Sequence, residues 1–180
     1  MSYFKKIILC LLVPILCLTG LSSCFSPKSP EHYVAFYLES AQSAGIFEAQ
    51  RTFVLPMLDK EVRTGRDPVL NMDALSDCVV SEKVDPVLNR SDYGLFFRIK
   101  DDYAIRLRQI SAAAAGRKLI LVADGKPLGF CSLSRNFTRN DLFFYVMTSA
   151  SGEEAKDQLD DLCFELNGFI LTFREFKEQQ

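Results

Sequence analysis

The feature that most constrains the fold is a pattern that occurs twice in the second half of the chain. A strand-like run containing Leu-Phe-Phe, first Tyr93–Lys100 and then Asp141–Thr148, precedes an amphipathic segment. An apolar residue at every third or fourth position places one apolar face along a helix. These positions, spaced i, i+4, i+7 and i+11, are Tyr103, Leu107, Ile110 and Ala114 in the first segment, and Ala155, Leu159, Leu162 and Leu166 in the second.

Capping and breaking residues give the expected ends of both helices. Asp101 is expected to cap the first helix, and Gly116 to end it in a left-handed conformation. Ser151 and Glu154 have the spacing of a capping box, and Asn167-Gly168 is expected to close the second helix.

The remaining segments of this half are rich in strand-forming residues. Lys118–Ala123 and Pro127–Leu133 flank Asp124-Gly125, a preferred two-residue hairpin turn, and Phe169–Phe176 is predicted to be a final strand. The pattern predicts an α+β fold, a mainly antiparallel sheet with two amphipathic helices on one face, of the split βαβ kind.

The first half of the chain is predicted to be β-rich. Tyr33–Glu39 reads as the first strand, and Thr52–Leu58 as an edge or bulged strand, because Pro56 has no amide hydrogen to donate. Smaller features complete this half: a short strand at Glu61–Arg63, a helical turn at Asn71–Leu75, a strand at Ser76–Val84 and a loop at Asp85–Asp92.

The beginning of the chain has the organisation of a secretory signal. Lys5 and Lys6 precede an apolar run, Ile7–Leu18, and small residues follow it. The run is too short to span a bilayer, which needs roughly 20 apolar residues. We therefore expect this part to be removed rather than to fold.

The four residues Leu21-Ser22-Ser23-Cys24 resemble the lipobox of bacterial lipoproteins. The resemblance implies that signal peptidase II recognises Leu21, Ser22 and Ser23 and cuts before Cys24, which is acylated and anchors the protein in the lipid bilayer. The mature chain would have 180 − 23 = 157 residues. The alternative is an ordinary secreted protein whose signal contains a cysteine.

The chain is thus expected to have four parts: a signal peptide (1–23), the lipidated cysteine with a tether (24–32), an N-terminal β-rich part (33–92) and an α+β part of the same domain (93–180). Pro27 and Pro30 mark the tether, and its last residue, His32, is the only histidine of the chain and is expected to be solvated. Phe25 follows the lipidated cysteine where an aspartate would signal inner-membrane retention in many lipoproteins. By that resemblance we expect the periplasmic face of the outer membrane.

The charge of the mature chain argues against nucleic acid as a partner. Removing Lys5 and Lys6 leaves 21 − 2 = 19 basic side chains against 23 acidic ones, a net charge of −4. No basic stripe is present. A protein or polypeptide is the expected partner.

Three of the six cysteines, Cys78, Cys131 and Cys163, would remain as side chains of the folded domain. All have apolar neighbours, which favours buried thiols. The alternative is a Cys131–Cys163 disulfide, because the periplasm is oxidising.

The sequence offers few groups for catalysis. A serine triad needs a positioned histidine, and no cysteine has a base near it in sequence. Glu154, Asp157, Asp160 and Asp161 share about one helix face and could weakly attract a divalent cation, but a solvated acidic face explains them better. We expect no catalytic residue, no metal and no cofactor.

Residues 93–168 resemble the head of the first periplasmic domain of SecD and SecDF, accessory subunits of bacterial protein export. The matching runs are Gly116-Arg117-Lys118-Leu119-Ile120-Leu121-Val122-Ala123-Asp124-Gly125-Lys126-Pro127-Leu128-Gly129 and Ser151-Gly152-Glu153-Glu154-Ala155-Lys156-Asp157-Gln158-Leu159. Ile110-Ser111-Ala112 stands where that family often has a threonine, and its transmembrane helices have no counterpart. The resemblance implies a fold and polypeptide handling, without a motor.

Three functions are compatible with these features. The leading hypothesis is a non-catalytic envelope lipoprotein that binds exported polypeptides at a sheet edge, for which the strand containing Pro56 is a candidate. The second is a structural accessory of an outer-membrane or envelope complex. The third, and the least supported, is a hydrolase.

Overall fold

The computed structural model describes residues 30–41, 50–55, 60–85, 90–135 and 141–179. Signal-peptide and lipobox residues, including Leu21, Ser22, Ser23 and Cys24, lie outside these ranges, as does Pro56. The described elements are β1 (Val34–Leu38), β2 (Gln50–Leu55), β3 (Lys60–Gly65), β4 (Leu70–Asn71), the 3-10 turn η2 (Met72–Ala74), β5 (Leu75–Asp85), β6 (Arg90–Ile99), α2 (Asp101–Ala113), β7 (Lys118–Ala123), β8 (Lys126–Ser132), β9 (Asp141–Val146) and α3 (Glu153–Glu178).

Seven of the strands form one sheet in the order β4-β1-β7-β8-β9-β6-β5, and the strand pairs within it are antiparallel. Its two end strands are joined by the three residues of η2. The ring of Phe36 on β1 lies 5.3 Å from that of Phe97 on β6 and 4.8 Å from that of Phe144 on β9, between ring centroids. Since flat neighbouring strands are about 4.8 Å apart, strands this distant in the sheet order meet only because the sheet curls around its core.

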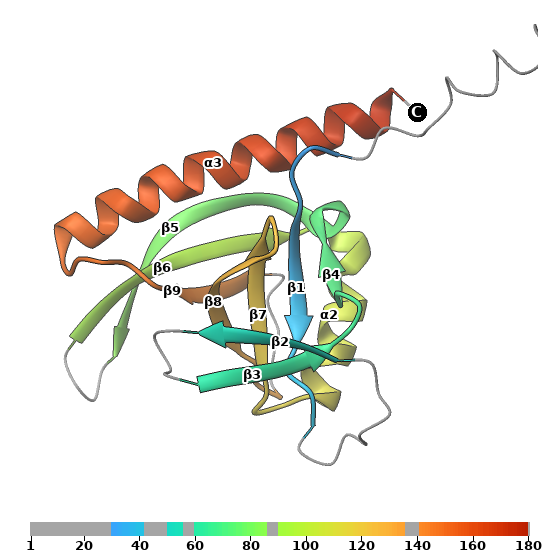
Figure 1. Cartoon of the computed structure of the whole chain (residues 1–180), viewed down its shortest axis with the longest axis horizontal. Coiled ribbons are helices and arrows are strands. Elements are labelled where there is room, and N and C mark those ends of the chain that lie inside the picture. The colour runs from blue at the N-terminus through green and yellow to red at the C-terminus, as the bar shows by residue number, and fades with distance from the viewer. Residues whose placement is uncertain (1–29, 42–49, 56–59, 86–89, 136–140, 180) are drawn as a thin grey trace, which may run out of the picture.

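The two helices pack on the concave face of this sheet. Leu107 of α2 and Leu159, Leu166 and Ile170 of α3 belong to the same buried cluster as Phe36 and its aromatic neighbours. Figure 1 shows α3 lying along β5 and β6. The predicted α+β class, with a mainly antiparallel sheet and both helices on one face, is confirmed.

The hairpin of β2 and β3 covers part of the other face and crosses the sheet strands (Figure 1). Its inward residues Phe53, Leu55 and Val62 form a second buried cluster with side chains of β1 and β7. Alternation along β1 explains the two clusters: Phe36 points to the helical side, and Tyr37 to the hairpin side.

The connection from β6 through α2 to β7 is split, because β9 and β8 lie between these two strands in the sheet. The prediction of a second strand–helix–strand unit is wrong. Helix α3 runs without interruption from Glu153 to Glu178, so Phe169–Phe176 is helical and Asn167-Gly168 does not end it. The apolar period continues past Gly168: Ile170 is 4% exposed, and Phe169 and Phe173 pack against the core.

The predicted N-caps also differ from the structure. Lys100 and Gly152 occupy the cap positions, so Asp101, Glu153 and Glu154 lie in first helical turns and Ser151 precedes its cap. Acidic side chains there are favourable because they face the positive end of the helix dipole.

The predicted hairpin turn is confirmed, because Asp124 and Gly125 have φ 48° and 79°, as a turn with two positive φ angles requires. Gly116 has the predicted left-handed conformation, with φ 86°, but α2 ends at Ala113 with Ala114 as its C-cap, so Gly116 lies two residues beyond the cap.

The strands predicted at Tyr33–Glu39, Lys118–Ala123 and Asp141–Thr148 match β1, β7 and β9 within two residues at either end. The strands predicted at Glu61–Arg63, Ser76–Val84 and Pro127–Leu133 match β3, β5 and β8 equally closely. Strand β6 begins three residues before the predicted Tyr93, and the predicted Thr52–Leu58 corresponds to β2 over Thr52–Leu55. The loop predicted at Asp85–Asp92 is shorter, because β5 reaches Asp85 and β6 begins at Arg90.

Candidate functional site

Strand edges are the natural place to look for polypeptide binding, because an edge carries unpaired backbone amides and carbonyls. Strand β2 pairs with β3 along its whole length and, among the described residues, with no other strand. The edge strand predicted at Thr52–Leu58 is confirmed over its described part, Thr52–Leu55.

The hydrogen bonds of β3 show which backbone groups of β2 face outward. Ser40 donates its amide to the Arg63 carbonyl on the side of β3 away from β2, at 2.7 Å. Both backbone groups of a residue in an antiparallel strand point to the same side, so Arg63 and its register partner Thr52 form a non-hydrogen-bonded pair. By alternation, the amides and carbonyls of Gln50, Thr52 and Val54 point to the open edge.

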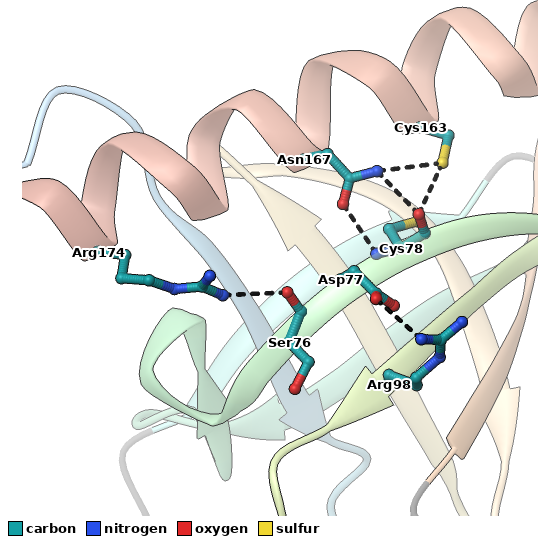
Figure 2. Close-up of polar contacts among 7 residues, drawn as sticks. All are labelled: Ser76, Asp77, Cys78, Arg98, Cys163, Asn167 and Arg174. Atoms are coloured by element: carbon teal, nitrogen blue, oxygen red, sulfur yellow. Dashed lines mark hydrogen bonds and ion pairs between the residues drawn. The ribbon is translucent and has the colours of Figure 1, made fainter.

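The outer edges of β3 and of the first part of β5 are occupied. Ser40 and Glu39 bind β3 through the Ser40–Arg63 bond and a bridge from Glu39 to Thr64. On β5, side chains of α3 occupy the backbone: Asn167 bonds to both the amide and the carbonyl of Cys78, and Arg174 donates to the Ser76 carbonyl at 3.1 Å (Figure 2). Edge strand β4 has only two residues. Within the described part of the chain, β2 therefore offers a six-residue strand edge that no other strand covers.

Side chains beside this edge are mixed in character. Val54 is 58% exposed, whereas its neighbours Phe53 and Leu55 point inward and anchor the hairpin. Arg51 is exposed, and its guanidinium donates to the Tyr37 hydroxyl at 3.2 Å. The inward side chains thus anchor the β2–β3 hairpin to the sheet, while the outer edge of β2 stays unpaired.

An aromatic patch continues the hairpin side of the sheet. Phe130 of β8 packs against the hairpin cluster and lies 5.7 Å from Tyr145, which lies 5.1 Å from Phe143 on the same strand, between ring centroids. The Lys83 ammonium lies 5.4 Å and 5.5 Å from the centroids of these two β9 rings. Gly94 makes room for them, because a Cβ there would lie 2.6 Å from the Phe143 ring.

The three cysteines are buried free thiols, as the favoured interpretation of the sequence predicted. Cys163 lies beside Cys78 and donates to its carbonyl at 3.1 Å, so the alternative of a Cys131–Cys163 disulfide is contradicted. Burial raises the pKa of Cys131 to about 12 and also raises those of Cys78 and Cys163. Little reactive thiolate forms at neutral pH under these conditions.

His32 is less free than the sequence predicted. Its Nδ1 lies 2.8 Å from the Asp124 carboxylate, and its ring stacks on Phe169 with 4.1 Å between centroids. The hydrogen bond with Asp124 raises the pKa of His32, and it lowers that of Asp124 together with the bond from the Tyr33 amide. Pro30, Glu31 and His32 line a cavity of about 190 Å³ with three phenylalanines of α3.

The acidic residues of α3 that could attract a divalent cation are not arranged as its ligands. Asp157, Asp160, Asp161 and Glu154 are exposed. The described ranges contain no group of three or more histidine, cysteine or acidic side chains suited to a metal ion. No helix within those ranges is long and apolar enough to cross a bilayer.

Comparisons with known proteins give two structural likenesses. No family model and no curated protein matches the chain. A crystal structure of SecDF in a super-membrane-facing form is 12% identical, with a TM-score of 0.49 over 78% of this chain and 18% of SecDF. A second structure, of SecDF as a membrane component that enhances protein export, is 15% identical with a TM-score of 0.42 over 71% of this chain and 60% of that one. The chain thus spans less than two thirds of either protein.

Proposed function

We propose that this chain is a non-catalytic lipoprotein of the bacterial envelope that binds extended polypeptides. Acylated Cys24 anchors it in the bilayer, with the outer membrane as the favoured location, and the domain faces the periplasm. An extended client adds a strand to the free edge of β2 and bonds to the outward backbone groups of Gln50, Thr52 and Val54. The observation that carries this proposal is the edge of β2, which no described strand covers, whereas β3 and the first part of β5 are covered.

Main-chain pairing suits clients of varied sequence. Backbone bonds supply affinity that does not depend on the client's side chains, and nearby side-chain pockets add preference. The aromatic patch of Phe130, Phe143 and Tyr145 lies on the same side of the sheet as the hairpin. It could contact apolar side chains of a client that extends beyond the hairpin. The resemblance of residues 93–168 to SecD heads favours an exported chain as the client.

The described chemistry supports binding rather than turnover. The thiols are buried with raised pKa values, and the sole histidine is held by Asp124 and Phe169. Neither arrangement provides the activated nucleophile that a hydrolase of the serine or cysteine type requires.

The test is a proline at an outward backbone position. Thr52→Pro removes an outward amide hydrogen but no β2–β3 hydrogen bond, and an edge strand tolerates proline where its amide faces solvent. We expect Thr52→Pro in the full chain to lose binding of a fluorescent unfolded outer-membrane protein, while circular dichroism shows an intact fold. Thr52→Val keeps the amide and is the matched control.

Unchanged client binding by folded Thr52→Pro would refute the site. The anchor is tested separately: Cys24→Ser should abolish incorporation of radiolabelled fatty acid and release the protein from membranes. Incorporation that persists in Cys24→Ser would refute acylation at this residue.

A further inference from the structure

Helix α3 has an outer face that nothing in the described structure covers. Phe164 is 84% exposed and Leu171 is 53% exposed, the former being the most exposed large apolar side chain of the described residues. They are seven residues apart, so they lie on one face of the helix, opposite the buried Leu159, Leu166 and Ile170. Exposure of a whole phenylalanine on a rigid helix costs hydrophobic free energy in the unbound protein.

The other residues of this face have the three- and four-residue spacing of a coiled-coil heptad, and together they form a seam along the helix. Steps of three and four from Phe164 pass through exposed positions only, which in chain order are Asp157, Asp161, Phe164, Gly168, Leu171, Glu175 and Glu178. The apolar centre is one heptad long, and two acidic residues flank it on each side. In the described ranges none of these four acids belongs to an ion pair.

Gly168 leaves a gap at the centre of the seam. A Cβ at this position would meet no atom within 4 Å, so the space between Phe164 and Leu171 is open. In coiled-coil packing, an apolar side chain of one helix enters such a hole between side chains of the other.

The charges decide what fits this face. Two copies of α3 packed in antiparallel fashion about Gly168 would place Asp161 against Glu175 and Asp157 against Glu178, and a parallel pair would place each acid against itself. An anionic lipid surface would be repelled in the same way. Only a partner with basic residues on both sides of an apolar centre gains from all four acids.

We propose that the outer face of α3 is a docking surface for a basic amphipathic helix. The partner carries two apolar residues one heptad apart, flanked on the same face by lysine or arginine. This surface is separate from the edge of β2 and does not depend on the polypeptide-binding proposal.

The experiment uses the full chain in a neutral detergent and two synthetic helical peptides. Both carry a leucine pair seven residues apart; one has lysine and the other glutamate at the flanking seam positions. In fluorescence anisotropy we expect the lysine peptide to bind, more weakly at high salt, and the glutamate peptide not to bind. Phe164→Ala should weaken binding of the lysine peptide at least about tenfold, as expected for an interface hot spot.

Two further variants sharpen the result. Ile105→Ala removes a comparably exposed apolar side chain, 61% exposed on α2, and should leave binding unchanged. Asp157→Lys combined with Asp161→Lys should weaken binding of the lysine peptide and strengthen binding of the glutamate peptide.

Three outcomes would overturn the proposal: equal binding of the two peptides, binding that Phe164→Ala leaves unchanged, or an effect of Ile105→Ala equal to that of Phe164→Ala. Self-association abolished by Phe164→Ala would assign the face to a second copy instead. Binding to phosphatidylglycerol vesicles abolished by the same variant would assign it to lipid.

Discussion

The side-chain amide of Asn167 spans the backbone of Cys78. Its Oδ1 accepts from the Cys78 amide at 2.9 Å, and its Nδ2 donates to the Cys78 carbonyl at 2.8 Å (Figure 2). One side chain of α3 thereby replaces a neighbouring strand at the edge of β5, where the rolled sheet ends. The contact stops this edge from pairing with another chain and fixes α3 in register on the sheet.

Asn167→Leu should therefore destabilise the domain. Leucine is close in size but leaves the Cys78 amide without a partner under the helix, and leaves the Cys78 carbonyl with only the weak thiol donor of Cys163. A buried unsatisfied group costs about 1–3 kcal/mol, so we expect the free energy of unfolding to fall by about 1–3 kcal/mol. Urea denaturation followed by circular dichroism measures it.

The matched variant is Asn167→Asp, which keeps the acceptor for the Cys78 amide and loses the donor to its carbonyl. The free energy of unfolding of this variant should lie between those of the wild type and Asn167→Leu. A loss below about 0.5 kcal/mol for Asn167→Leu, the range of ordinary surface substitutions, would show that the contact does not hold the edge.

The same residue explains the main error of the sequence-based prediction. Asn-Gly commonly ends a helix because both residues tolerate a left-handed backbone. Here the Asn167 side chain binds a strand 89 residues away in sequence, and Ile170 and Phe173 continue the buried face beyond it. Local preference pointed to a helix end, and tertiary packing overrode it.

Other features depended on local pattern and were predictable. The hairpin at Asp124-Gly125, the apolar faces of both helices and the edge character of the segment before Pro56 follow from spacing and backbone chemistry alone. The curl of the sheet brings Phe36 to Phe97, and the pairing of His32 with Asp124 joins residues 92 positions apart. Neither contact could be predicted from a local pattern in the sequence. The exposed Phe164 face was missed because the end of α3 was predicted to be a strand.

Two glycines should respond to alanine in opposite directions. A Cβ at Gly129 would lie 2.2 Å from the Tyr145 carbonyl oxygen, where β8 and β9 meet, so Gly129→Ala must push these strands apart. Overpacking of this kind costs about 1–3 kcal/mol. Gly168→Ala meets open space within a helix and should stabilise the protein by about 0.5–1 kcal/mol.

Thermal unfolding of both variants beside the wild type checks this pair. Gly129→Ala should have the lower melting temperature and Gly168→Ala the higher. Opposite shifts, or an unchanged melting temperature for Gly129→Ala, would contradict the close approach of β8 and β9 at this point.

The thiols should be unreactive until the protein unfolds. Burial raises the pKa of Cys131 to about 12, and also raises the pKa values of Cys78 and Cys163. We expect a chromogenic disulfide reagent at pH 8 to modify none of the three in the native protein and all of them in denaturant. Measured on residues 24–180 with Cys24→Ser, in which these are the only thiols, fast labelling of any of them would show that its burial is incomplete.

The contact between His32 and Asp124 should be pH-dependent within a defined window. Asp124 raises the pKa of His32 above its ordinary 6.5, so the contribution of His32 to stability is complete below pH 6.5 and is lost as the pH rises through the raised value. The pKa of Asp124 is lowered from 3.8, so its contribution is complete above pH 3.8 and is lost as the pH falls through the lowered value. The ion pair is therefore strongest between these pH values.

NMR titration of the imidazole reads this contact directly, because His32 is the only histidine. We expect a pKa above 6.5 in the wild type and a lower one in Asp124→Asn, which keeps a polar side chain but removes the charge. Phe169→Ala removes the stacked ring and leaves Asp124 in place, so the pKa should stay above 6.5 while the ring-current shift of the imidazole protons disappears. A pKa that Asp124→Asn leaves unchanged would mean that the segment before β1 does not hold His32 against the hairpin turn.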